Sequence, residues 1–287
     1  MSNYEDFLKG KIVAAAPKGF DIGIEQLNEN LFDWQKSVVQ WALRRGRAAL
    51  FEACGLGKTL QQLEWANQVH RLTGENVLIL APLAVAGQTV REGAKFGIAV
   101  HKCRTQDDVR NGVNITNYEM LEHFDASNFI GIVLGESSIL KGFSGKTRNT
   151  ICSTFADTPY RLACTATPAP NDHVELGNHS EFLGVMPNVN MLSTWFVNDG
   201  FDAGKWRLKG HAVEDFWRWV STWAVCLSKP SDMGYDDAGY QLPPLRTIKR
   251  NVGEEFNCRN GELIRTKAPS ATDLGRELRE TIVISIS

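Results

Sequence analysis

The sequence predicts an α/β domain in which a mostly parallel sheet carries helices on both faces. Two continuous apolar runs, residues 77–81 and 129–134, are typical of strands that are covered on both faces. Segments with helical periodicity separate the apolar runs, as crossovers between parallel strands require. A short apolar strand at 49–52 also leads into a glycine-rich turn and then into an amphipathic helix.

The composition is that of an ordinary globular protein. The 287 residues are 43% hydrophobic and 22% charged, enough for one large domain or one domain plus part of another. A net charge of −2 gives no overall basic field, so any nucleic-acid binding must come from local patches. No signal peptide and no apolar run of membrane-spanning length is present, so we expect a cytoplasmic protein without a membrane partner.

The cysteines predict neither a disulfide framework nor a metal site. They are scattered, with no Cys-x-x-Cys pair and no histidine spacing suited to zinc. We therefore expect reduced thiols at all six positions, which are 54, 103, 152, 164, 226 and 258.

The first helices flank the glycine-rich turn. Residues 1–30 form a short lead-in, broken by proline and glycine. A helix then runs to Arg45, with Asp33 as its N-cap and Gly46 at its end. The helix after Thr59 turns its apolar residues inward and stops at Gly74.

The glycine-rich turn is a predicted phosphate-binding loop, here called the phosphate loop (residues 53–59). Gly55 and Gly57 let successive backbone N–H groups point inward at a helix N-terminus, which favours an anion. Lys58 can then reach the β- and γ-phosphates, and the Thr59 hydroxyl can ligate Mg²⁺. The alternative is a chance glycine turn before a helix. The order of strand, loop and helix favours the phosphate site.

The remaining elements continue the alternation of strand and helix. After the strand at 77–81, a helix is expected at 85–96 and a buried strand at 129–134 that ends near Glu136. The other expected elements are short strands at 98–100 and 113–116, a helix at 146–155 and a strand at 161–164.

Three of these segments resemble motifs of superfamily 2 helicase-like ATPases, particularly the Swi/Snf-type branch. Glu52-x-x-Gly-x-Gly-Lys-Thr resembles that branch's phosphate loop, in which Glu52 stands where the strict pattern has glycine. Gly135-Glu136 ends a buried strand, and Thr-Ala-Thr-Pro at 165–168 follows the next one. The resemblance covers about residues 31–250 and implies the RecA-like P-loop NTPase fold of a first motor lobe, with ATP and Mg²⁺ as cofactors and single- or double-stranded DNA as partner.

The resemblance also implies a role for each matching residue. Glu136 orients or deprotonates the attacking water, Lys58 contacts the phosphates, and Thr59 holds the metal. Gln35 reads the adenine edge, although a helix glutamine is usually only solvated. The expected nucleotide-binding residues are Gln35, Ala53, Cys54, Gly55, Leu56, Gly57, Lys58 and Thr59. The expected coupling residues are Thr165 and Thr167, and the expected nucleic-acid contacts are Gln88, Thr89, Arg91, Asn117 and Tyr118, with a core role as the alternative for Tyr118.

Gly135 is the main departure from the family pattern. The family has aspartate there, which holds Mg²⁺ through its hydration shell, and no carboxylate in the adjacent sequence replaces it. Loss of an outer-shell partner typically costs 10- to 100-fold in metal affinity or activity. We therefore expect weak or absent ATP hydrolysis, with MgATP binding retained.

The C-terminal third is less informative. Tryptophans interleaved with basic residues at 195–223 suit either nucleic-acid stacking or one packed helix face over 216–225, and the spacing favours packing. From residue 230 the composition loosens, and strands are expected at 246–252 and 281–287. The expected domains are the lead-in (1–30), an ATP-binding lobe (31–228), and a linker with the truncated start of a second lobe (229–287).

These observations favour a motor and leave two other classes open. The resemblance implies the ATP-binding domain of a DNA helicase or translocase, of phage or bacterial type because the chain is compact. The first alternative is a pseudo-ATPase that binds ATP and DNA and acts with a separately encoded second lobe; Gly135 favours it. The second is an unrelated P-loop kinase, against which the Thr-Ala-Thr-Pro segment argues.

Overall fold

The computed structural model describes residues 15–141, 145–198 and 206–240. The chain divides into two compact units, residues 1–241 and 242–287, and the second lies outside the described residues. So do the strands expected at 246–252 and 281–287. All described elements therefore belong to the first unit.

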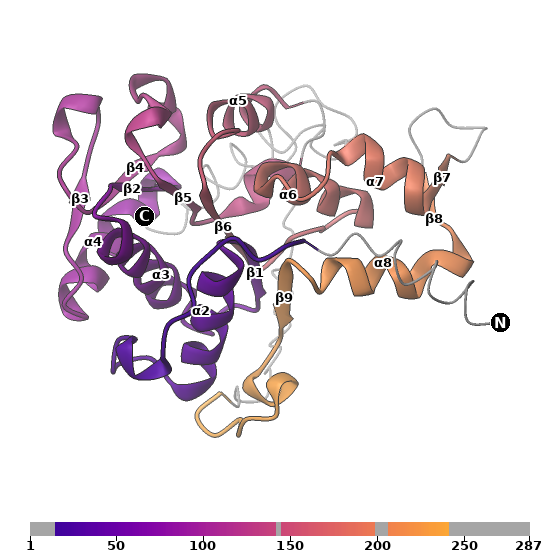
Figure 1. Ribbon diagram of the computed structural model, residues 1–287, viewed down its shortest axis with the longest axis horizontal. Coiled ribbons are helices and arrows are strands. Elements are labelled where there is room, and N and C mark those ends of the chain that lie inside the picture. The colour runs from indigo at the N-terminus through magenta and orange to yellow at the C-terminus, as the bar shows by residue number, and fades with distance from the viewer. Residues whose placement is uncertain (1–14, 142–144, 199–205, 241–287) are drawn as a thin grey trace, which may run out of the picture. The chain divides into compact units, whose positions relative to one another are not determined.

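The first unit is built on a seven-stranded parallel sheet in the order β3-β4-β2-β5-β6-β1-β9 (Figure 1). The predicted α/β class with a parallel sheet is confirmed. The strands are β1 (Arg47–Glu52), β2 (Val77–Ala81), β3 (Val100–Lys102), β4 (Val113–Asn117), β5 (Gly131–Leu134), β6 (Tyr160–Thr165) and β9 (Ala224–Leu227). A separate antiparallel pair is formed by β7 (Phe196–Asn198) and β8 (Trp206–Leu208).

Helices cover both faces of the sheet, because alternate strand residues point to opposite sides. Ala48 and Leu50 of β1 pack with the core that contains α2 and α3, whereas Ala49 and Phe51 pack with the core that contains α6 and α8. On the first face lie α2 (Asp33–Arg45), α3 (Lys58–Thr73) and α4 (Leu83–Lys95). The second core takes in α5 (Lys146–Thr154), α6 (Leu176–Leu183), α7 (Asn188–Trp195) and α8 (Val213–Val220).

Short 3₁₀ turns fill many of the connections. They are Ile24–Gln26, Gln106–Asp108, Tyr118–His123, Ala126–Asn128, Ser137–Lys141, His173–Glu175, Gly210–Ala212 and Pro230–Met233.

Different local interactions fix the two ends of α2. The N-cap is Phe32 rather than the expected Asp33, because Gln35 reaches back and accepts a hydrogen bond from the Phe32 N–H at 3.0 Å. At the other end Gly46 adopts φ +71°, and its N–H donates to the carbonyls of Ala42 and Leu43. The predicted glycine stop is confirmed and the predicted N-cap is wrong.

Two strands differ from the sequence-based expectation. The strand expected at 98–100 begins only at Val100, because the Ile98 N–H donates to the Gly93 carbonyl and keeps that residue at the end of α4. The packed helix face expected over 216–225 ends at Val220. Ser221 and Thr222 turn their hydroxyls back onto helix carbonyls, which stops the helix and lets 224–227 form β9.

The tryptophans of this region are mostly core residues, as the packing interpretation predicts. Trp219 and Trp223 are fully buried and Trp195 nearly so, whereas Trp217 is 42% exposed. The ring centroids of Trp195 and Trp219 are stacked 4.6 Å apart. Burial removes these side chains from the surface that a nucleic acid would contact.

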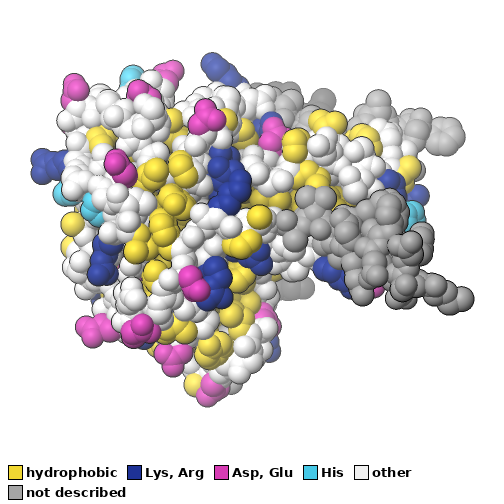
Figure 2. Space-filling view, viewed as in Figure 1, with side chains coloured by type: hydrophobic (Ala, Val, Ile, Leu, Met, Phe, Trp, Pro, Cys, Tyr) yellow, Lys and Arg dark blue, Asp and Glu magenta, His cyan; other side chains and the backbone are white. Residues whose placement is uncertain are grey.

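Several general properties follow from the described part of the chain. No helix there is long and apolar enough to span a membrane. Five cysteines are free within those ranges, and no cluster of three His, Cys, Asp or Glu residues could hold a metal. Figure 2 shows acidic and basic side chains interspersed over the face in view, in keeping with the small net charge.

Candidate functional site

The predicted site residues converge at one edge of the sheet. The phosphate loop follows β1, Glu136 follows β5, and Thr165 ends β6; these three strands are neighbours in the order β5-β6-β1. The carboxyl ends of parallel strands meet at the same edge, where open α/β sheets bind their ligands. The fold therefore brings together motifs that span more than a hundred residues of the sequence.

The phosphate loop has the backbone geometry of an anion cradle. Gly55 and Gly57 adopt φ values of +87° and +76°, a region that residues with a Cβ rarely enter. A Cβ on Gly57 would also lie 2.5 Å from the Gln35 Nε2 atom. The helix α3 begins at Lys58, so its free N–H groups and its dipole face the loop.

Lys58 holds the loop closed on itself. Its Nζ donates to the Glu52 and Ala53 carbonyls at 2.7 and 2.9 Å. An anion in the cradle competes with these two neutral acceptors for a point charge, and a phosphate is the stronger partner. The structure thus shows Lys58 within reach of the cradle and bonded to groups that it can leave.

Gln35 connects α2 to the phosphate loop. Its side chain is only 3% exposed, and its Nε2 donates to the Leu56 carbonyl at 2.9 Å. Together with the bond from Phe32, this uses one donor and one acceptor of the amide and leaves one N–H and one lone pair. Gln35 is therefore a structural part of the loop, and its predicted adenine contact stays a prediction.

A buried carboxyl lies behind the loop. Glu52 at the end of β1 is fully buried and accepts a hydrogen bond from Gln61 of α3 at 2.8 Å. Burial raises the pKa of Glu52 to about 7, against the opposing effects of Gln61 and of the Lys58 charge. Within the described ranges, the second oxygen of Glu52 and the Oε1 of Gln61 have no hydrogen-bond partner. A proton on Glu52 gives these two side chains a further hydrogen-bond donor.

The acid and the coupling loop (residues 165–171) are joined directly. The Thr165 hydroxyl donates to Glu136 Oε1, and the Thr167 N–H donates to that same hydroxyl oxygen at 3.0 Å. The Tyr118 hydroxyl donates to the Glu136 backbone carbonyl at 3.1 Å. Hydrogen bonds thereby link Glu136 to the ends of two strands, β6 and β4.

A histidine that the sequence did not single out lies beneath Glu136. His179 of α6 is fully buried, and its Nε2 pairs with the Ser137 hydroxyl at 3.1 Å. Burial lowers the pKa of His179 to about 4, so the ring is neutral at pH 7. Its ring packs edge-on against Phe51 of β1. No local sequence pattern marks this residue, because its partners come from strand β1 and from the 3₁₀ turn that follows β5.

The predicted nucleic-acid contacts do not all reach the surface. Gln88 and Arg91 lie exposed on α4, and Gln88 donates to Glu92 at 2.8 Å. Thr89 is 1% exposed and bonds the Val85 carbonyl. Asn117 and Tyr118 are each 8% exposed, in keeping with the core alternative for Tyr118. The structure thus separates an exposed pair from three residues whose side chains are buried.

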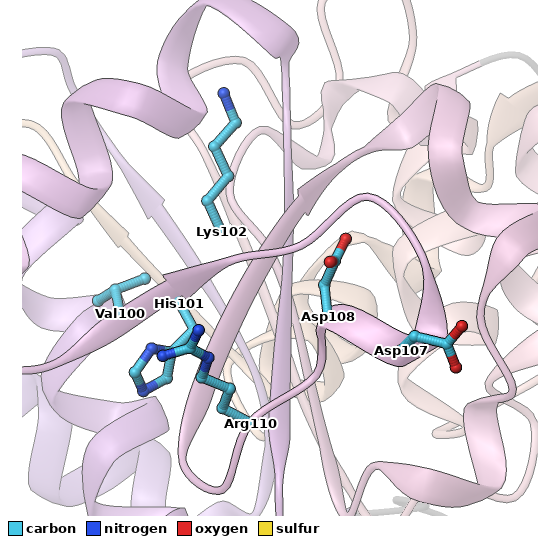
Figure 3. A pocket seen from close by; sticks show the side chains of 6 residues that line it. All are labelled: Val100, His101, Lys102, Asp107, Asp108 and Arg110. Carbon is cyan, nitrogen blue, oxygen red and sulfur yellow. The ribbon is translucent and has the colours of Figure 1, made fainter.

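Other hollows of the described residues lie outside the phosphate loop. An apolar cavity of about 600 Å³ is bordered by the coupling loop, the exposed Trp217 and the β9 residue Cys226. Another, of about 330 Å³, lies along β3, at the opposite end of the strand order from β9 (Figure 3). Figure 3 shows two carboxylates on one side of it and the His101 and Arg110 side chains on the other. Asp108 there caps its own loop through the Arg104 and Thr105 N–H groups, a structural task.

Comparisons with known proteins agree with this architecture. No family model matches the chain. Stretches of 188 and 185 residues are 27% and 28% identical to DNA excision repair protein ERCC-6-like from Bos taurus and Mus musculus. Each match covers 55% of this chain but only 15% of that protein's length.

A solved structure gives the fold. The Sulfolobus solfataricus SWI2/SNF2 ATPase core in complex with dsDNA aligns with a TM-score of 0.60 at 19% identity. The alignment covers 76% of this chain and 48% of that one. The chain therefore has the RecA-like fold found in SWI2/SNF2 ATPase cores, which confirms the predicted fold.

Proposed function

We propose that this chain is the ATP-binding lobe of a DNA helicase or translocase, which couples ATP binding and hydrolysis to contact with DNA. The observation that carries the proposal is the hydrogen bond between Thr165 and Glu136 beside the phosphate loop. It links the acid that faces the nucleotide to a loop that can respond to it. A phosphate-binding kinase has no need for such a link.

The residues present suit MgATP. The left-handed glycines open the cradle, Lys58 is held by two exchangeable bonds, and Thr59 is half-buried at the start of α3. A magnesium ion bound there with ATP would supply positive charge to the phosphates. Thr59 supplies a hydroxyl to the ion, and Glu136 orients the attacking water through the oxygen that Thr165 leaves free.

Two observations support contact with DNA, one from the comparisons and one from α4. The solved SWI2/SNF2 core is a complex with dsDNA, and exposed Arg91 and Gln88 supply polar contacts of the kind that position a phosphate backbone. We place the ATP-binding lobe at residues 31–228, with the remainder leading toward a second lobe in this or a separate chain.

A second candidate function is a pseudo-ATPase that binds ATP and DNA without turnover. Gly135 favours it, because the described acidic motif holds one carboxylate where two are expected. The candidates differ in one measurable respect. An ATPase releases phosphate in response to DNA, whereas the pseudo-ATPase binds both ligands and releases none.

The test is phosphate release from MgATP by the full chain, with and without double-stranded DNA, beside Gly135→Asp and Lys58→Ala. We expect slow DNA-stimulated release by the natural chain and release about 10- to 100-fold faster by Gly135→Asp, since the aspartate restores an outer-shell partner. Lys58→Ala is the matched negative control. ATP binding with no release from any variant would select the pseudo-ATPase, and failure to bind ATP at all would end both proposals.

A further inference from the structure

The space beside Gly135 is bordered by an amide. Gly135 follows β5, and its N–H donates to the Leu80 carbonyl at 2.8 Å. A Cβ placed on Gly135 would lie 3.3 Å from Gln62 Oε1 and 3.3 Å from that same carbonyl. The oxygen of Gln62 is therefore next to the point from which an aspartate side chain at 135 would extend.

That oxygen has no hydrogen-bond partner among the residues that the structure describes. Gln62 is 4% exposed, and its Oε1 accepts no hydrogen bond from any residue that the structure describes. A buried amide oxygen left in this state destabilises the folded chain, because it has given up its hydrogen bond to water without gaining another. A ligand that donates a hydrogen bond there recovers this free energy.

Gln62 also lies on the same side of α3 as the predicted metal ligand. It follows Thr59 by three residues, and residues three apart are neighbours on a helix surface. The carboxylate of Glu136 belongs to the residue after Gly135. Thr59 and Gln62 thus occupy neighbouring positions on α3, and the Gln62 oxygen lies next to the strand end that Glu136 follows.

The chemistry of this oxygen fits hydrated Mg²⁺. The ion prefers oxygen ligands and usually keeps several waters, whose hydrogens need acceptors. A neutral amide oxygen attracts such a water less strongly than a carboxylate does, and more strongly than an aliphatic side chain.

We propose that Gln62 takes the place of the absent aspartate, with its Oε1 accepting a hydrogen bond from a water of the Mg²⁺ bound with ATP. The inference rests on the proposed function, and it makes Gln62 a positioning residue for the metal. It also gives a use to Gly135, because the absence of a side chain there leaves room for the glutamine.

The test measures metal dependence of binding rather than turnover. Binding of a fluorescent non-hydrolysable ATP analogue to the full chain is titrated with Mg²⁺, and the bound metal is counted directly with Mn²⁺ by electron paramagnetic resonance. In Gln62→Leu we expect the half-saturating metal concentration to rise about 10- to 100-fold, with binding in EDTA unchanged. Gln62→Glu, which keeps the shape and adds charge, should lower it.

Two further variants separate a metal role from a packing role. Gln68→Leu removes another buried amide of α3, which bonds Gln26 and Glu64, and should leave the metal dependence unchanged. In Gly135→Asp the same Gln62→Leu change should have a smaller effect, because the carboxylate now holds the water.

The possible outcomes are distinct. Metal-dependent analogue binding that no Gln62 variant alters overturns this inference and leaves the proposed function standing. No analogue binding under any condition overturns the proposed function, and the inference with it. If Gln62→Leu does not fold, the direction of the shift in Gln62→Glu decides.

Discussion

At the scale of single residues, Glu52 links folding to pH. Its folded pKa of about 7 lies above the ordinary value of 4.5, so between these pH values the unfolded chain has released the proton that the folded chain keeps. The stability that the Glu52 carboxyl contributes is fully present below pH 4.5 and is lost as the pH rises to 7. A shift of this size corresponds to about 3 kcal/mol.

The first prediction follows from this loss of stability with rising pH. Glu52→Gln should leave the free energy of unfolding near its natural value at pH 4 and raise it by about 3 kcal/mol at pH 8. The amide keeps the hydrogen bond from Gln61 and adds a donor for its unpartnered oxygen. Urea denaturation at the two pH values measures the difference. Glu122→Gln, at an exposed position, is the control that should change neither.

The second prediction concerns His179, whose pKa of about 4 lies below the ordinary 6.5. Here the unfolded chain binds the extra proton, so stability is present above pH 6.5 and is lost as pH falls toward 4. Glu52 and His179 therefore oppose each other between pH 4.5 and 6.5. In His179→Gln the free energy of unfolding should fall as pH rises between 4.5 and 6.5, because only the Glu52 effect remains. In Glu52→Gln it should rise over the same range, because only the His179 effect remains. Parallel pH profiles for both variants would contradict these assignments.

At the scale of elements, β9 protects the strand that carries the phosphate loop. The carbonyls of Trp223 and Leu227 accept hydrogen bonds from Ala49 and Ala53, at the two ends of the pairing with β1. In a parallel pair of strands, every second residue points its N–H group toward the neighbouring strand. The N–H of Val225 therefore faces β1, whereas the N–H of Cys226 points away from it. Without β9, β1 would be an open edge.

The third prediction uses that alternation. Val225→Pro removes an N–H that faces β1 and should lower the free energy of unfolding by about 1–3 kcal/mol more than Cys226→Pro. Both prolines impose the same backbone restriction, so the second is a matched control. Denaturant unfolding measures the difference, and equal losses would show that β9 contributes no ladder bonds at these positions.

The elements also show what the sequence could predict. Strand β2, the helix α3 and its Gly74 stop follow from local patterns, because apolar runs and glycine act on their immediate neighbours. The short β9 was missed because its four residues form a strand only when β1 is alongside. At the site, the loop and Glu136 could be found from motifs, whereas Gln62 and His179 could not, because their partners are set by packing.

At the scale of the whole first unit, the segment after β9 returns to α2. The Tyr235 hydroxyl pairs with the Ser37 hydroxyl at 2.8 Å, and the Tyr240 ring packs edge-on against Phe32 and Trp34. The chain thereby leaves the sheet at one edge and settles on the helix that carries Gln35.

The fourth prediction tests this contact. Tyr235→Phe removes one hydroxyl and should raise hydrogen exchange in residues 230–240 about 2- to 13-fold, as loss of a hydrogen bond of about 0.5–1.5 kcal/mol implies. Tyr240→Phe keeps its ring contacts and should leave exchange unchanged. Hydrogen exchange followed by mass spectrometry measures both, and equal protection in the two variants would assign the contact to the rings alone.

The same return path has a mechanical meaning. Residues 235–240 lie against α2, and Gln35 on that helix is bonded to the Leu56 carbonyl inside the phosphate loop. The stretch after β9 is therefore joined to the sheet through β9 and to the phosphate loop through α2. Residues 235–240 therefore brace α2, and a change that loosens them would also loosen the contact between Gln35 and the phosphate loop.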